Sequence, residues 1–314
     1  MRAIVLNKPG APEQLKIENR EIPKTKPGWS VIKVKSFGLN HAESITRKGG
    51  SPTVKLPRVI GIECVGVIVD ATDEHLKVGE PVMTLMGGLG RVFDGSYEEY
   101  VLAPNNQIYS LPINASWEQL ATIPESGYTA FGSIKNCKIK AGQSVLVRGA
   151  TSTVGIAATQ LLHAMGAKVT GTTRNSKKFQ FIKDQGADKI VLDQDNKLQT
   201  DAKYDAIIEF VGEKTLADSL QHIKRPGGIV NVTGELADEW TNPNFTAFMI
   251  PSGSYLTSFQ STWVNRGWIN EMLKLIEDNH LQFPIGKTLP FDQIVQAHHL
   301  LDSGQAHGKI VIKI

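Results

Sequence analysis

The chain has 314 residues, 41% of them hydrophobic and 21% charged, with a formal net charge of +3 at pH 7. This length predicts roughly two globular domains, and basic residues that are scattered rather than clustered argue against a nucleic-acid partner. The apolar runs are shorter than the roughly 18 residues that span a bilayer, and the N-terminal run is too short for a signal peptide. Only two cysteines occur, so we expect no disulfide framework and a cytoplasmic protein without a membrane partner.

Short strands separated by Gly, Pro and Asp turns fill the first 121 residues. Apolar and polar side chains alternate in Val31–Lys35, an almost continuous apolar run covers Val59–Val69, and Gly79–Met83 has the pattern of a turn entering a strand. Such patterns are typical of an all-β domain. We therefore predict a small β-barrel in this part of the chain.

Between residues 122 and 262 the pattern changes to alternating strands and helices. This alternation predicts an α/β domain, with a doubly wound parallel sheet covered by helices on both faces. The predicted strands are 144–149, 168–173, 189–192, 204–210, 229–233 and 254–259, which make a six-stranded sheet. Helices are predicted over 156–165, 179–183 and 216–223.

The first strand of this domain runs through Gly149 into a helix that starts near Gly155. Backbone N–H groups and the dipole at a helix N-terminus favour a bound pyrophosphate. Ser152 stands where the usual fingerprint has a middle glycine; a serine keeps the same backbone path if its φ is negative, and its hydroxyl can donate to a phosphate. We predict that Gly149, Ser152, Thr153, Val154 and Gly155 bind a dinucleotide; the alternative is an ordinary βα turn.

The second strand of the domain ends without any acidic residue. The segment from Gly171 to Lys178 reads Gly-Thr-Thr-Arg-Asn-Ser-Lys-Lys. Sheets of this kind that prefer NAD carry a carboxylate there, which binds the ribose hydroxyls. The planar guanidinium of Arg174 can instead bind a 2′-phosphate. The segment predicts NADPH as the cofactor; the alternative is a solvated basic loop.

The last 50 or so residues are too short for a further domain. We predict helices over 268–277 and 291–301 and a final strand over 309–313, which returns to the first domain. The expected boundaries are therefore 1–121 and 263–314 for the first domain and 122–262 for the second. His298 and His299 are adjacent on a predicted helix, so their side chains diverge, which favours a surface or interdomain role over a metal site.

Several motifs, each weak alone, occur in a characteristic order along almost the full length. They are Gly38-Leu-Asn40, Gly61-Ile-Glu-Cys-Val-Gly66, Val78-Gly-Glu-Pro-Val82, Gly95-Ser-Tyr-Glu-Glu-Tyr-Val101, Gly127-Tyr-Thr-Ala-Phe131, the turn from Gly149 to Gly155, and Gly308-Lys-Ile-Val311. With them the chain resembles the medium-chain dehydrogenase/reductase superfamily, and within it the zinc-independent quinone oxidoreductases. The resemblance implies a GroES-like β-barrel catalytic domain and a Rossmann dinucleotide-binding domain.

The zinc-dependent branch of that superfamily holds its catalytic metal with a Cys, a His and a second Cys. The corresponding places hold Asn40 and Ile62, with Ser126 near the third. An isoleucine cannot ligate, and catalytic zinc needs three protein ligands. Residues 84–100 contain none of the four cysteines of the structural zinc lobe. We therefore expect no metal.

The resemblance also implies roles for individual residues. Asn40 and Thr129 are expected to face the nicotinamide and the substrate, where the Asn40 amide can donate to a developing oxyanion; turn formation is the alternative role for Asn40. Lys178 stands where the family has a phosphate-binding lysine. Strand-end backbone groups are expected to hold the carboxamide and the ribose. The implied cofactor-binding residues, besides those of the glycine turn, are Thr173, Arg174, Lys178, Phe210, Val211, Gly212, Thr233 and Gly234.

The implied activity is NADPH-dependent, zinc-free reduction of quinones or related conjugated carbonyls by hydride transfer in the cleft between the domains (EC 1.6.5 class). A 2-alkenal or enone reductase is the alternative enzyme. An alternative of another class is a catalytically idle NADPH-binding protein with a regulatory or RNA-binding role. The strand near 254–259 is apolar and uncharged, and the family often joins subunits there, so we expect a homodimer.

Overall fold

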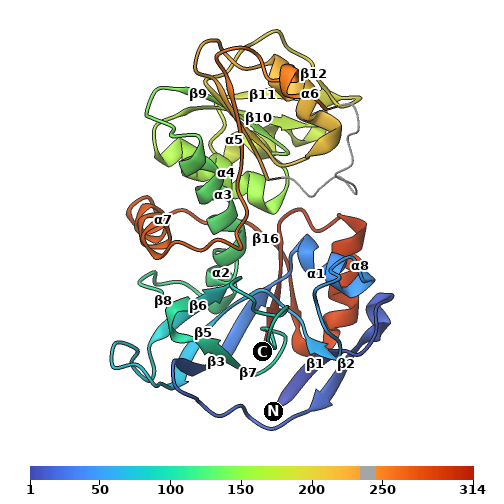
Figure 1. Cartoon of the computed structure of the whole chain (residues 1–314), viewed down its shortest axis with the longest axis vertical. Coiled ribbons are helices and arrows are strands. Elements are labelled where there is room, and N and C mark those ends of the chain that lie inside the picture. The colour runs from blue at the N-terminus through green and yellow to red at the C-terminus, as the bar shows by residue number, and fades with distance from the viewer. Residues whose placement is uncertain (234–244) are drawn as a thin grey trace. The chain divides into compact units, whose positions relative to one another are not determined.

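The computed structural model describes residues 1–233 and 245–314 (Figure 1). The chain forms two compact units. The first comprises residues 1–125, 262–273 and 282–314, and the second comprises 126–261 and 274–281. Residues 274–281 thus belong to the second unit.

The first unit is built on β-strands. Its elements are β1 (Arg2–Leu6), η1 (Pro12–Gln14), β2 (Leu15–Asn19), β3 (Trp29–Gly38), α1 (His41–Lys48), β4 (Arg58–Val59), β5 (Glu63–Asp70), β6 (Pro81–Leu85), β7 (Tyr100–Pro104), η2 (Asn105–Gln107), β8 (Ile108–Ser110), α2 (Trp117–Leu120), β16 (Ile285–Pro290), η5 (Phe291–Gln293), α8 (Ile294–Ser303) and β17 (Lys309–Lys313). Helix α7 (Arg266–Asp278) runs from the first unit into the second.

Two sheets enclose the core of the first unit. One has the order β2-β1-β4, and the other has the order β16-β17-β3-β5-β6-β8, with β7 pairing along β3. The long strand β3 is central, because β5, β7 and β17 all pair with it antiparallel. The alternation predicted for Val31–Lys35 places Ile32 and Val34 in the buried core, while Lys33 is exposed.

The final strand returns to the first unit as part of its main sheet. β17 lies between β16 and β3, and Ile312 pairs in register with Phe37. Both side chains are fully buried. The last residues therefore form an interior strand of the barrel domain.

Helix α8 corrects one prediction. His298 is fully buried, and its Nε2 lies 2.9 Å from the hydroxyl of Tyr97 while its Nδ1 accepts from Arg47 at 3.2 Å. Burial lowers the pKa of His298 to about 3. The predicted surface or interdomain role is thus wrong for His298, because it lies on the apolar face of α8 that packs into the core. The side chain of His299 does diverge from that of His298 and is exposed.

The second unit contains a parallel sheet. Its elements are α3 (Pro124–Asn136), β9 (Ser144–Arg148), α4 (Thr153–Ala164), β10 (Lys168–Thr173), η3 (Ser176–Lys178), α5 (Phe179–Asp184), β11 (Lys189–Gln194), β12 (Lys197–Leu198), β13 (Ala206–Glu209), α6 (Glu213–Gln221), β14 (Ile229–Val232), η4 (Ala247–Met249) and β15 (Tyr255–Ser258). The sheet order is β12-β11-β10-β9-β13-β14-β15.

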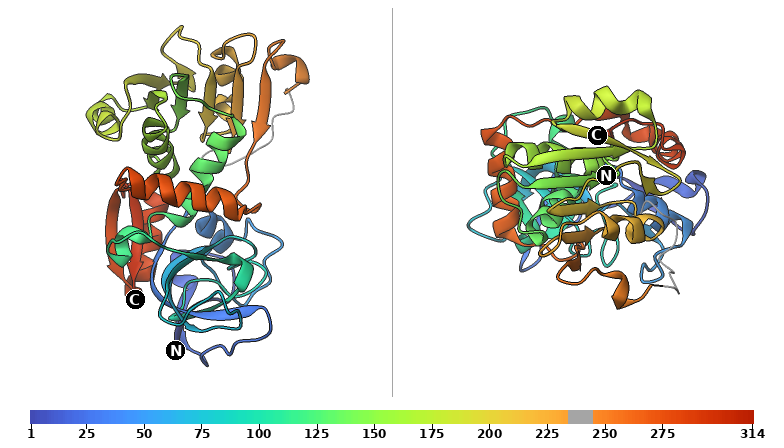
Figure 2. Two further views of the ribbon diagram at one scale, coloured as in Figure 1. Left: turned by 90° about the vertical axis from the view of Figure 1, so that its left-hand side faces the viewer. Right: turned by 90° about the horizontal axis from the view of Figure 1, so that it is seen from above.

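The strand order places a switch point beside β9. From β9 the chain moves outward through β10 and β11, and then resumes on the other side with β13, β14 and β15. Helices cover both faces of the sheet (Figure 2). Six strands are parallel, as predicted, and the short β12 adds an antiparallel seventh. In open sheets of this type, ligands bind at the carboxyl ends of the strands next to the switch point.

In the described residues, no helix has the length and hydropathy needed to cross a membrane.

Candidate active site

The turn between β9 and α4 has the backbone geometry of an anion site. Gly149 has φ 85°, and a Cβ at Gly155 would collide with the carbonyl oxygen of Gly149. The two glycines therefore let the helix start directly against the turn. Ser152 has φ −77°, which meets the condition set for a serine at this place.

The hydroxyl of Ser152 serves the helix start itself. It donates to the carbonyl of Gly149 at 2.8 Å and accepts from the N–H of Gly155 at 3.0 Å, so Ser152 is the N-cap of α4. Among the hydrogen bonds of residues 1–233 and 245–314, none uses the N–H groups of Thr153 and Val154. These N–H groups, at the positive end of the dipole of α4, are the donors that a pyrophosphate requires.

The end of β10 carries the cationic segment. Thr173 is buried and its hydroxyl accepts from the N–H of Asn175 at 3.1 Å, which turns the chain out of the sheet. Arg174 is exposed and Lys178 is half-buried, at the last residue of η3. In the described part of the chain neither side chain has an ion pair. Both cations are therefore available to an anionic ligand at the carboxyl end of β10.

The turn after β13 contains Phe210, Val211 and Gly212. Phe210 is buried, and Gly212 has φ 110° before the start of α6. The carboxylate of Glu209 accepts from the N–H of Val211 at 2.8 Å and from that of Gly212 at 3.2 Å. A buried acid at the strand end thus shapes this turn.

Thr129 and Thr233, two predicted site residues of the second unit, are connected through the hydroxyl of Ser133. In α3, the Ser133 hydroxyl donates to the carbonyl of Thr129 at 2.7 Å, and it lies 3.0 Å from the hydroxyl of Thr233. Thr129 is 8% exposed. Thr233 follows β14, so α3 and the end of β14 meet at the same edge of the sheet. The predicted Gly234 lies outside the described residues.

In the first unit, Asn40 belongs to a buried polar cluster. Its Nδ2 donates to Oε1 of Glu63 at 2.9 Å and makes a longer contact of 3.5 Å with Oε1 of Glu43. Its Oδ1 accepts from Nζ of Lys309 at 2.6 Å, and the same Nζ lies 2.6 Å from Oε1 of Glu63. The amide is therefore held in one orientation by two carboxylates and an ammonium group.

The cluster places two acids beside one cation. Glu43, Glu63 and Lys309 are each at most 1% exposed. Burial, and then the charge of Glu63, raise the pKa of Glu43 to about 7. The opposing influences include the N–H groups of Ile62 and Asn40, which donate to its carboxylate. Near neutral pH Glu43 can therefore hold or release a proton inside the barrel.

The positions that correspond to the zinc ligands of the zinc-dependent branch do not provide a set of metal ligands. Asn40 is hydrogen-bonded as described, and Ile62 is a buried hydrocarbon side chain. Throughout residues 1–233 and 245–314, no group of three or more His, Cys, Asp or Glu side chains is arranged to hold a metal ion. Cys64 is fully buried and burial raises its pKa, so it is an interior thiol.

Sequence reasoning did not identify the buried charged residues of the site. Glu63 and Lys309 occur within the motifs Gly61-Ile-Glu and Gly308-Lys-Ile-Val. A charged residue inside an apolar strand pattern was therefore the sequence signal that could have indicated their burial. Gly38 belongs with them, because a Cβ there would collide with Cε of Lys309. The motif glycine thus makes room for the ion pair.

Two family models match the sequence. Residues 26–113 match the alcohol dehydrogenase GroES-like domain, and residues 185–312 match a model described as zinc-binding dehydrogenase. These matches confirm the predicted α/β fold class, with a GroES-like domain and a Rossmann-type sheet that indicates a nicotinamide cofactor.

Full-length relatives agree with this assignment. The chain is 30% identical over 347 residues to a zinc-type alcohol dehydrogenase-like protein of Schizosaccharomyces pombe, covering 100% of this chain and 99% of the relative. It is 30% identical over 326 residues to the quinone oxidoreductase of Homo sapiens, covering 99% and 97%. The structure of an NAD-dependent alcohol dehydrogenase superposes with a TM-score of 0.88 at 25% identity, covering all of both chains. The protein is thus an oxidoreductase, and the chain belongs to the quinone oxidoreductase family of the medium-chain dehydrogenase/reductase superfamily.

Proposed function

We propose that the protein is an NADPH-dependent, zinc-free reductase of quinones or related conjugated carbonyls. When bound, the reduced nicotinamide supplies the hydride. A quinone accepts hydride readily because the hydroquinone anion that forms is aromatic, and a proton from water completes the hydroquinone, so the reaction does not depend on a Lewis acid. Transfer in a cleft between the domains stays a prediction from the sequence.

The fit of a dinucleotide rests on the turn between β9 and α4. Thr153 and Val154 offer backbone donors at the helix start, and Gly155 leaves no side chain between helix and turn. A pyrophosphate would receive charge-favoured hydrogen bonds there. The hydroxyl of Ser152 is used as the helix cap, so in this arrangement the backbone is the main source of donors.

The proposed preference for NADPH over NADH rests on one observation, the charges of the segment that follows β10. Arg174 and Lys178 follow β10, and no carboxylate stands in residues 171–178 to bind ribose hydroxyls. A charge-assisted hydrogen bond to a 2′-phosphate contributes on the order of 1.5–3 kcal/mol. Each cation can therefore favour NADPH by roughly tenfold or more.

In the proposed reaction Asn40 is the candidate donor to the substrate oxygen. Its shorter bond, to Glu63, fixes the amide, whereas the 3.5 Å contact with Glu43 is the weaker one. A developing oxyanion near this second N–H would therefore compete only with a weak hydrogen bond, and the amide would not have to rotate. Lys309 holds the amide oxygen and so keeps the N–H groups from rotating away.

Steady-state kinetics with both cofactors and two acceptors test the proposal. We expect NADPH to be oxidised with 9,10-phenanthrenequinone, and kcat/KM to be at least about tenfold lower with NADH. Turnover of 2-alkenals but not of quinones would show an enone reductase instead. Cofactor binding without turnover of either acceptor would show the idle NADPH-binding protein.

A further inference from the structure

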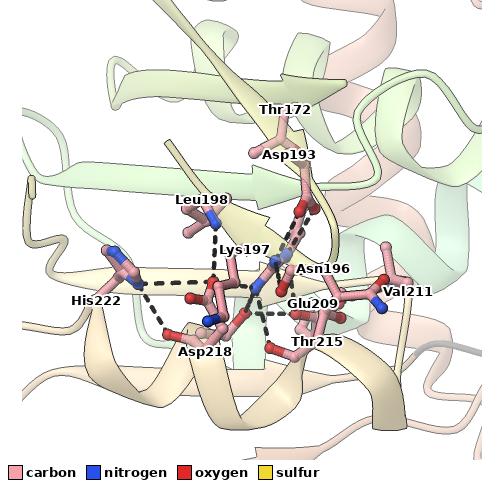
Figure 3. Close-up of polar contacts among 12 residues, drawn as sticks. Thr172, Asp193, Asn196, Lys197, Leu198, Glu209, Val211, Thr215, Asp218 and His222 are labelled. Atoms are coloured by element: carbon pink, nitrogen blue, oxygen red, sulfur yellow. Dashed lines mark hydrogen bonds and ion pairs between the residues drawn. The ribbon is translucent and has the colours of Figure 1, made fainter. Parts of the chain in front are cut away.

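A buried ion cluster lies at the carboxyl ends of β9, β11 and β13 in the second unit (Figure 3). Its centre is Arg148, whose side chain is fully buried. The guanidinium donates to both carboxylate oxygens of Asp193 at 2.8 Å and to Oδ2 of Asp218 at 2.8 Å. Its other acceptors are the hydroxyl of Ser219 and the carbonyls of Thr215 and Asn196. All three guanidinium nitrogens are thus used.

Glu209 connects this cluster to the turn after β13. Arg148 and Glu209 are register partners on adjacent parallel strands, and Nε of Arg148 lies 3.9 Å from Oε2 of Glu209. Oε2 also accepts from the Ser219 hydroxyl at 2.5 Å. Oε1 accepts from two successive backbone N–H groups, those of Val211 and Gly212. The fully buried carboxylate therefore has donors on both oxygens.

These bonds decide what the turn can offer to a ligand. The N–H groups of Val211 and Gly212 are both taken by Glu209. In the described part of the chain, no hydrogen bond ends on the carbonyl oxygen of Phe210 or of Val211. At this turn the backbone thus presents acceptors, and its donors are already bonded. Ribose hydroxyls and a carboxamide NH2 are groups that such acceptors bind.

We propose that Glu209 and Arg148 are positioning residues for the dinucleotide. Glu209 gives the turn after β13 its acceptor character, and Arg148 holds Glu209 in place. Arg148 is also the last residue of β9, directly before Gly149, so the residue paired in register with Glu209 stands at the start of the glycine turn. The inference rests on the proposed function, because it requires that a nicotinamide dinucleotide binds at this edge.

Three variants test the proposal against a purely structural role. Glu209→Gln keeps the shape but replaces one accepting oxygen by a donor. Ser219→Ala leaves every charge in place and removes one donor to Glu209, so it is expected to fold. Asp205→Asn is the matched control: Asp205 accepts from Ser144 and Lys224 at the amino end of the same strand, away from the cofactor turns.

The readouts are the dissociation constant of NADPH from fluorescence titration, the thermal midpoint, and the KM of NADPH against kcat. We expect Glu209→Gln to raise the dissociation constant about tenfold and Ser219→Ala about threefold, with kcat retained at saturating NADPH. Asp205→Asn should lower the thermal midpoint and leave the dissociation constant within about twofold.

The outcomes separate the two proposals. If Glu209→Gln and Ser219→Ala weaken binding no more than Asp205→Asn does, the positioning role is wrong while the cofactor assignment stands. If Glu209→Gln does not fold, an unchanged dissociation constant in Ser219→Ala overturns the positioning role. If the wild-type protein binds neither NADPH nor NADH, the proposed function itself fails.

Discussion

Lys309 and Glu63 form an ion pair inside the barrel domain, with Nζ of the lysine 2.6 Å from Oε1 of the glutamate. The second oxygen of Glu63 accepts from the N–H of Glu125 at 2.6 Å. Lys309 belongs to β17, Glu63 begins β5, and both pack beside β3. The pair therefore joins the last strand of the chain to the residues around Asn40.

Replacing Lys309 by methionine should strongly destabilise the barrel domain. The change leaves Glu63 buried without its cation, which typically costs about 3–5 kcal/mol. Lys313→Met is the matched control, since Lys313 lies on the same strand and pairs with Glu118 at the surface. The control should change the free energy of unfolding by less than about 1 kcal/mol. If urea denaturation showed equal losses of unfolding free energy in the two variants, Lys309 would not stabilise the buried cluster.

Glu43 should make stability depend on pH between about 4.5 and 7. Its pKa is raised to about 7 in the folded protein, so over this range the folded state binds a proton that the unfolded state has lost. This contribution is present at low pH and is lost as the pH rises toward 7, by on the order of 3 kcal/mol.

Glu43→Gln mimics the protonated acid and isolates that contribution. His298 acts in the opposite sense, because its lowered pKa makes folding less favourable below its unfolded value. The informative quantity is therefore the difference in unfolding free energy between variant and wild type, measured from pH 5 to 8. It should grow in favour of the variant as the pH rises; a constant difference would refute the assignment.

Arg174→Ala should raise the KM of NADPH by about tenfold and leave that of NADH nearly unchanged. The reason is that the guanidinium is expected to contact only the 2′-phosphate, which NADH lacks. Lys183→Ala removes an exposed cation from α5 and serves as the control. If the wild type uses both cofactors equally, or if Arg174→Ala affects both alike, the basic segment does not select NADPH.

The purified protein should contain substoichiometric zinc and keep its activity in a chelator. The prediction follows from Asn40 and Ile62, which stand in the places of two zinc ligands. Metal analysis by mass spectrometry and an assay in EDTA provide the check. One zinc per chain, with activity lost on its removal, would contradict the prediction of a zinc-independent enzyme.

We expect a homodimer joined at β15. In the described sheet this strand pairs only with β14, it carries no charge, and Tyr255 on it is 61% exposed. Unpaired edges of this kind are usually covered in native proteins. Light scattering at micromolar concentration should give twice the chain mass, and Tyr255→Lys should shift the protein toward the monomer. A monomeric wild type would rule the interface out.

The sequence pattern predicted the six parallel strands of the second unit because each of them is a short apolar run with a turn signal. It also predicted the glycine turn, where local backbone requirements fix the residue types. Helix α3 was missed: Gly127 and Gly132 lower its helix propensity. A Cβ at Gly132 would collide with the ring of Phe259 on the neighbouring segment. Tertiary packing, which leaves no local signal, therefore favours the glycine there.

The buried charges escaped prediction for a related reason. Arg148 ends the apolar run of β9, and its partners Asp193 and Asp218 are far away in the sequence. Nothing local distinguishes such an arginine from a surface residue at a strand end. The same holds for Glu43, whose burial depends on α1 packing inside the barrel domain.

The position of β17 has a consequence for synthesis of the protein on the ribosome. All strands of the parallel sheet lie within residues 144–258, so that unit can acquire its sheet while the chain is still being translated. The barrel cannot, since β17 fills the place between β16 and β3. Until Lys309 has been added, the acids around Asn40 have no counter-charge. The nascent chain can therefore form the sheet of its second unit before that of its first.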